Sequence, residues 1–295
     1  LLTCPKTRRG CRLSSILFLP VSMDIQRRFL TLPSGHQVHY RMAGVGPAMI
    51  LMHPSPSSSE GLVRAMNVFA ERFTCIALDT PGYGISDDSV ADKTELWGFA
   101  DVVAQVLDVF CLEDTVIYGA ATGAQIGVQF ARKYPQRTRL LIMDGAGHFS
   151  KEDLVQISDG YFVDLTPRRD GSHLLAAWDA SRHLSVFFPW MSERLDQRIQ
   201  ASAAPPASVQ HGVNDMLRAG PSYRDAYWQA FQVENNGNAS QVTVPTVLAF
   251  NTTSIVRPHT EALIELGLPD NFTVVPLDPP TRYAKILEAA APYTG

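Results

Sequence analysis

The sequence predicts an α/β protein whose mainly parallel sheet is covered by helices on both faces. Short all-apolar runs, typical of buried parallel strands, alternate with stretches in which apolar residues recur at helical spacing. Gly- and Pro-containing turns follow several of these runs. Of the 295 residues, 45 % are hydrophobic and 18 % charged, so the chain can bury a large core.

Charge and cysteine content exclude several classes of function. The net charge is −4 and no basic stripe occurs, so we expect no nucleic-acid partner. The four cysteines do not have the spacing of a zinc site, and no metal or cofactor is expected. The sequence contains no apolar run long enough to cross a membrane.

The first half of the chain predicts alternating strands and helices. Alternation of polar and apolar residues around a Pro/Gly turn predicts a hairpin of residues 28–32 and 37–41. The elements expected after it are a strand at 48–52, a helix at 60–72, a strand at 74–78, a helix at 96–110, a strand at 115–118, a helix at 124–134 and a strand at 139–143.

The pattern changes after residue 147. Helical periods and aromatic residues dominate 148–241, whereas strands resume at 243–250 and 272–277, before a last helix at 282–290. We therefore predict a core formed by 23–147 and 242–295, with a helical cap at 148–241. Such a cap is expected over the carboxyl ends of the strands, where open α/β sheets bind ligands.

Residues 1–22 differ from the rest of the chain. Basic residues are followed by a short apolar run at 13–21 that contains Ser and Pro and is not followed by a small-residue cleavage pattern. Our interpretation is a disordered extension ahead of a domain that begins at Met23, in a cytoplasmic protein. A signal or transit peptide is the alternative.

Four motifs in order resemble the capped α/β-hydrolase fold family, which includes haloalkane dehalogenases, epoxide hydrolases and esterases. They span roughly residues 24–295. The motifs are the run His53-Pro54-Ser55-Pro56 after a strand, the turn Asp79-Thr80-Pro81-Gly82-Tyr83-Gly84-Ile85-Ser86, the strand–turn–helix at 118–127, and the strand at 245–250.

The resemblance implies a ligand site at the strand ends. The backbone N–H groups of Ser55 and Thr122 would form an oxyanion hole, and His53 would lie at the pocket floor. In the cap, Trp178 and Trp190 would line an apolar wall, although packing alone is the safer interpretation of either residue.

The side chains of the family's usual catalytic triad are missing. The nucleophile position of the G-x-S-x-G elbow holds Ala121, whose methyl group cannot attack a carbonyl. Ser254 stands where the acid is expected, and the loop 278–282 after the last strand contains no His. Three substitutions together indicate natural divergence, and they disfavour ordinary serine-hydrolase activity.

One other acid–base constellation is available. Asp144 ends the strand after the elbow helix, where it would either orient a His or cap the following turn. His148 and His173 lie in the predicted cap, and either one with Asp144 would activate water or remove a proton without a covalent intermediate. The other reading of each cap His is an ordinary surface or packing residue.

Three hypotheses for function follow. The first is a protein without the triad that binds a small, largely apolar carbonyl or ester-like ligand, with weak chemistry or none. The second is an active hydrolase or lyase that uses a cap His with Asp144. The third is a structural or partner-binding relative whose pocket is filled by cap side chains. The sequence leaves the oligomeric state open.

Overall fold

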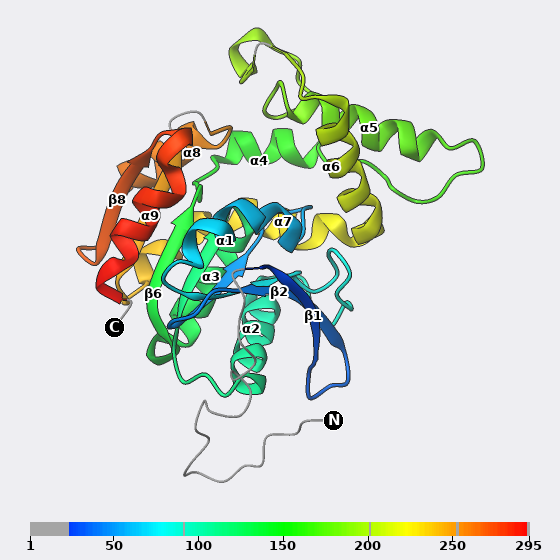
Figure 1. Cartoon of the computed structure of the whole chain (residues 1–295). Coiled ribbons are helices and arrows are strands. Elements are labelled where there is room, and N and C mark those ends of the chain that lie inside the picture. The colour runs from blue at the N-terminus through cyan, green and yellow to red at the C-terminus, as the bar shows by residue number, and fades with distance from the viewer. Residues whose placement is uncertain (1–23, 91, 201, 252–253, 294–295) are drawn as a thin grey trace.

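The computed structural model describes residues 24–90, 92–200, 202–251 and 254–293 (Figure 1). The expectations for residues 1–22 and for a start at Met23 lie outside these ranges. Within them, no helix is both long and apolar enough to span a membrane.

An eight-stranded sheet forms the centre of the molecule, with the strand order β1-β2-β4-β3-β5-β6-β7-β8. The hairpin β1–β2 is antiparallel and joins β4 antiparallel, whereas all later neighbours pair in parallel. The strands are β1 (Gln26–Thr31), β2 (Gln37–Ala43), β3 (Ala48–Met52), β4 (Thr74–Leu78), β5 (Thr115–Ala120), β6 (Thr138–Asp144), β7 (Thr246–Asn251) and β8 (Phe272–Leu277).

Helices cover both faces of this sheet because its strands are apolar on both sides. Along β3, Met49 and Leu51 face the apolar cluster that includes α1 (Val63–Phe69) and α9 (Arg282–Ala290). The alternate residues Ile50 and Met52 face the cluster that includes the helices of the other layer. These helices are α2 (Trp97–Val109), α3 (Thr122–Lys133) and α8 (Arg257–Glu265).

Four helices are inserted between β6 and β7, in the segment predicted as a cap and called the cap below: α4 (Lys151–Ser158), α5 (Ser172–Leu184), α6 (Pro206–Ala219) and α7 (Arg224–Gln232). In Figure 1 the first three lie beyond the strand ends, and α7 lies closer to the sheet, where it contacts α3. A capping box of Ser150 and Asp153 begins α4 directly after the chain leaves β6.

The predicted fold class is confirmed, and most predicted elements are present. The bounds of β3, β4, β8 and α9 match the predicted ranges. The helix expected at 60–72 is shorter, because a 3-10 turn, Ser59–Leu62, precedes α1. Within the region predicted to be helical, α5 ends at Leu184, five residues before Pro189.

Candidate functional site

A strained turn joins β5 to α3 at Ala121. The backbone of Ala121 has φ 46° and ψ −110°, which a residue with a side chain rarely adopts. Its N–H donates to the Asp144 carbonyl at 3.0 Å, so the turn is anchored on β6. A Cβ at Gly119 would lie 2.2 Å from the Gly123 carbonyl oxygen, and one at Gly123 would lie 2.3 Å from that of Met52. The two glycines therefore permit the close contact that the turn requires.

The turn presents backbone donors instead of a nucleophile. Thr122 is the first residue of α3, so its N–H has no acceptor within the helix. Its hydroxyl is buried without a hydrogen-bond partner among the described residues. Ser55, the other expected donor, is buried beside Tyr83, whose hydroxyl donates to the Tyr223 carbonyl of the cap at 2.7 Å.

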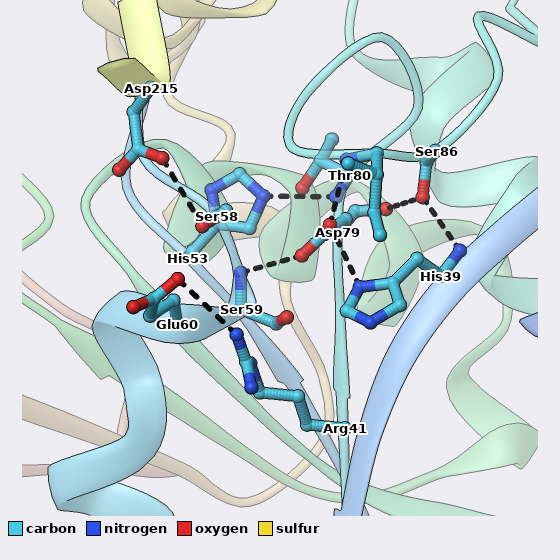
Figure 2. Close-up of polar contacts among 11 residues, drawn as sticks. His39, Arg41, His53, Ser58, Ser59, Glu60, Asp79, Thr80, Ser86 and Asp215 are labelled. Carbon is cyan, nitrogen blue, oxygen red and sulfur yellow. Dashed lines mark hydrogen bonds and ion pairs between the residues drawn. The ribbon is translucent and has the colours of Figure 1, made fainter. Parts of the chain in front are cut away.

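His53 has a structural role in the floor of this site (Figure 2). Its Nδ1–H donates to the Pro54 carbonyl, and its Nε2 accepts from the Thr80 N–H, both at 2.9 Å. Burial lowers the pKa of His53, and protonation would cost the bond from Thr80. The ring is therefore neutral and ties the loop after β3 to the loop after β4.

Asp79 ties the same two loops together from below. Its carboxylate accepts from the N–H groups of Ser59 at 2.7 Å and Ile85 at 3.0 Å, and from the His39 ring at 2.9 Å. Burial alone would raise the pKa of Asp79, but the hydrogen bonds from Ser59 and Ile85 contribute to lowering it overall. A Cβ at Gly84 would lie 2.1 Å from the Asp79 carboxylate. The structure therefore gives Asp79 and Gly84 a loop-shaping role.

Asp144 contacts an arginine and a tyrosine rather than a histidine. Its Oδ2 accepts from Tyr118 Oη at 2.5 Å and from Arg282 Nε at 3.0 Å, and lies 2.6 Å from Arg282 Nη2. The side chain is 1 % exposed. Burial lowers the pKa of Arg282, but Asp144, Tyr118 and Tyr283 together raise it above its usual value. Arg282 begins α9, directly after the loop in which the sequence lacks the usual His.

The cap histidines lie elsewhere. The His148 N–H donates to the His259 carbonyl at 2.8 Å, and the His148 Nδ1 atom is buried without a partner among the described residues. His173, in the first turn of α5, accepts from the Arg168 N–H at 3.2 Å. The contacts of Asp144, His148 and His173 therefore do not include the acid–base pair expected from the sequence.

The two cap tryptophans are packing residues in this structure. Trp190 donates its ring N–H to the Tyr161 carbonyl at 2.9 Å, and Trp178 packs on the large apolar cluster. Tyr161 also hydrogen-bonds Tyr227 between hydroxyls 2.7 Å apart. Tyr161 belongs to a separate cluster of buried aromatic residues in the cap, together with Phe149, Phe188 and Phe231.

Sequence reasoning missed Asp215, which reaches down from α6 to the loop after β3 (Figure 2). Its carboxylate is 3.4 Å from the hydroxyls of both Ser57 and Ser58, and 3.5 Å from His211 Nε2. Asp215 is 2 % exposed, and burial raises its pKa. Its place between the buried Val213 and Met216 on α6 was the available signal.

The described cavities are separate from the Ala121 turn. A crevice of about 570 Å³ lies at the start of α2 and is lined by Asp92, Glu95 and Trp97 among others. A second cavity of about 10 Å³ lies inside the core, against Met52, Thr80 and Ile126. Ala121 itself is partly exposed.

The parallel sheet, the strained turn at its centre and the helical insertion after β6 define an α/β-hydrolase fold. A family model described as the alpha/beta hydrolase fold matches residues 47–278. The chain belongs to this family.

Individual relatives support the same assignment. A 2-(acetamidomethylene)succinate hydrolase of Mesorhizobium japonicum is 30 % identical over 246 residues, which cover 78 % of this chain and 84 % of that protein. An uncharacterized protein of Mycobacterium bovis is 34 % identical over 118 residues, which make up 34 % of its length. The structure of a variant potato epoxide hydrolase superposes with a TM-score of 0.67 at 17 % identity, covering 92 % of this chain and 99 % of that one.

Proposed function

We propose that this protein binds a small, largely apolar carbonyl or ester-like compound at the Ala121 turn and does not use a covalent triad mechanism. The observation that carries the proposal is the strained conformation of Ala121, which persists although its methyl group has no chemistry to perform. Such a conformation costs on the order of 1–3 kcal/mol. A ligand-binding role for the backbone around Ala121 explains why the strained conformation is kept.

The arrangement of donors supports a carbonyl oxygen as the anchor. The N–H of Thr122 and the N-terminal end of the α3 dipole meet beside Ala121, and both favour partial negative charge. Loss of the nucleophile from a triad lowers turnover by roughly 10⁶-fold, which leaves binding as the main remaining capacity. The Mesorhizobium relative is named as a hydrolase of 2-(acetamidomethylene)succinate, a compound that contains an amide carbonyl.

Thiol labelling of Ala121→Cys tests the proposal. A small thiol reagent should add one more label to this variant than to the wild type, as read by intact mass, because Ala121 is partly exposed. Short-chain esters and ketones that raise the melting temperature of the wild type should slow this labelling. If none of the tested esters and ketones raises the melting temperature or slows labelling of the cysteine at position 121, the proposal is contradicted. That result would favour a pocket filled by side chains of the cap.

The alternative with a cap His and Asp144 receives no support from the observed contacts. Asp144 binds Arg282 and Tyr118, and His173 binds the backbone of its own segment. Turnover of activated esters by the wild type, lost in His148→Ala or His173→Ala, would establish that alternative instead. Ala121→Ser alone should restore little activity, because the contacts of Asp144 among the described residues are with Arg282 and Tyr118 and include no His.

A further inference from the structure

Ser55, one of the two donors of the proposed ligand site, lies in a short turn of residues 54–57, called the Ser55 turn below. The Ser57 N–H donates to the Pro54 carbonyl at 2.9 Å and closes this turn. The Ser55 N–H itself donates to no backbone carbonyl among the described residues. The direction of this N–H is therefore set by the contacts that hold the two ends of the turn.

The core holds the chain on both sides of the Ser55 turn. On the side of β3, the His53 ring donates to the Pro54 carbonyl and accepts from the Thr80 N–H, both at 2.9 Å. On the other side, the Ser59 N–H donates to the Asp79 carboxylate at 2.7 Å. The stretch between these two anchors contains the donor and the two serines that follow Pro56.

The cap holds the end of the turn through one buried carboxylate. Asp215 of α6 accepts from the Ser57 hydroxyl with Oδ2 and from the Ser58 hydroxyl with Oδ1, both at 3.4 Å. Figure 2 shows Asp215 above Ser58, on the opposite side from the contacts of Asp79. The exposed His211 lies 3.5 Å from Asp215 Oδ2 on the same helix. The two serine hydroxyls therefore tie this stretch of the loop to α6.

A second contact with the cap lies beside Ser55. The Tyr83 hydroxyl donates to the Tyr223 carbonyl at 2.7 Å, and the Tyr83 ring packs edge-on against that of His53, with centroids 5.7 Å apart. Tyr223 ends the 3-10 turn Gly220–Tyr223, which follows α6 directly. Both contacts thus come from one continuous segment of the cap, and a movement of this segment would change the support of the Ser55 turn.

We propose that Asp215 is a positioning residue for the ligand site. By holding the hydroxyls of Ser57 and Ser58, it fixes the direction of the Ser55 N–H. Ligand binding at the Ala121 turn and docking of α6 on the core are therefore coupled. The role of the N–H rests on the proposed function, whereas the contacts of Asp215 do not. Because coupling is reciprocal, a ligand that gains affinity from the docked α6 must also hold α6 in place.

Two substitutions at Asp215 separate its hydrogen bonds from its charge. Asp215→Ala removes both acceptors. Asp215→Asn keeps an oxygen for the Ser58 hydroxyl and offers an N–H to the oxygen of Ser57, because a hydroxyl group can donate or accept. Arg132→Leu is the matched control, since Arg132 also joins the core to the cap, through residues 238 and 241, but does so in the last turn of α3.

Hydrogen exchange without ligand tests the positioning role. In Asp215→Ala, the N–H groups of Ser57 and Ser59 should exchange on the order of 10-fold faster, together with those of α6. Asp215→Asn should restore the protection of both segments, and Arg132→Leu should leave the Ser55 turn at its wild-type rate. If Asp215→Ala releases α6 while the turn keeps its wild-type exchange, Asp215 only fastens the cap and the proposal is wrong.

Acetophenone, a small and largely apolar ketone without a hydrolysable bond, tests the coupling by calorimetric titration. Its Kd should rise on the order of 10-fold in Asp215→Ala and stay within about 2-fold of the wild type in Asp215→Asn and Arg132→Leu. In the wild type it should slow exchange in α6. Equal affinity for the wild type and Asp215→Ala would overturn the coupling and leave the proposed function intact. If neither acetophenone nor the other ketones and esters bind the wild type, the proposed function fails, and exchange of the Ser55 turn alone decides the positioning role.

Discussion

Ala121 shows that a backbone conformation can persist without the side chain that normally uses it. Gly119, Gly123 and the bond to the Asp144 carbonyl hold the turn in which Ala121 has a φ of 46°. The elbow could be predicted from sequence because its small residues lie within a few positions of one another. The partner of Asp144 could not, since Arg282 is 138 positions away and reaches it only through the strand order β6-β7-β8.

Replacement of Ala121 by Gly should test the strain. Ala→Gly ordinarily destabilises a helical segment by about 0.5–1 kcal/mol. At position 121 the relief of a positive φ opposes that cost, so Ala121→Gly should be neutral or stabilising by about 1 kcal/mol in urea unfolding. Ala131→Gly, inside α3, is the matched control and should destabilise. Equal losses in both variants would argue against strain at Ala121.

The ion pair of Asp144 and Arg282 should behave as a buried unit. Arg282→Met leaves the carboxylate of Asp144 buried without its cation, so we expect a loss of about 3 kcal/mol in unfolding free energy. The double variant D144N/R282M removes both charges and should recover much of that loss. Additive losses in a double-mutant cycle would show that the two groups are not coupled.

At the scale of elements, the strands and helices followed the apolar pattern closely. The expected ranges of β3 and β4 are the observed ones because both strands are buried on both faces. Helix ends were less predictable: the helix expected from residue 60 begins at Val63, because the Ser-rich turn before it is held by Asp79, a tertiary contact. Trp178 packs against the main apolar cluster and Trp190 against both that cluster and the cap aromatics, which helical periodicity alone does not specify.

The junction of β5 and α3 should be intolerant of a single methyl group. Gly119→Ala places a Cβ 2.2 Å from a backbone oxygen, so we expect a loss of more than 3 kcal/mol or failure to fold. Gly171→Ala is the control, because its Cβ meets nothing within 4 Å and only its φ of +73° is unfavourable. That variant should lose about 1 kcal/mol. Circular dichroism during thermal unfolding measures both.

For the whole molecule, the attachment of the cap is the property that local sequence reveals least. Asp215 of α6 contacts Ser57 and Ser58, and Tyr83 donates to Tyr223, across separations of more than 130 residues. These contacts depend on how the insertion folds back over the sheet. The residues that make these contacts belong to no recognised motif. The one available signal was the position of Asp215, which lies among the buried residues of its helix.

Removal of the Asp215 carboxylate should loosen the cap selectively. Asp215→Ala leaves two serine hydroxyls without their acceptor, and we expect hydrogen exchange in α6 to become about 10-fold faster, equivalent to about 1.4 kcal/mol. Exchange in β3 and β5 should change less. Asn214→Ala, at the exposed neighbouring position, should leave α6 protected. Uniform acceleration across core and cap in Asp215→Ala would indicate global destabilisation instead.

The contact between Gly84 and Asp79 also limits which residues relatives can have at these two positions. The carboxylate occupies the volume that a side chain at position 84 would need, with 2.1 Å to the place of its Cβ. Substitutions at the two positions should therefore depend on each other. A relative with a side chain at the position of Gly84 must have a shorter or displaced residue at the position of Asp79. The loops that this aspartate joins should accordingly be exchanged between relatives as a set rather than singly.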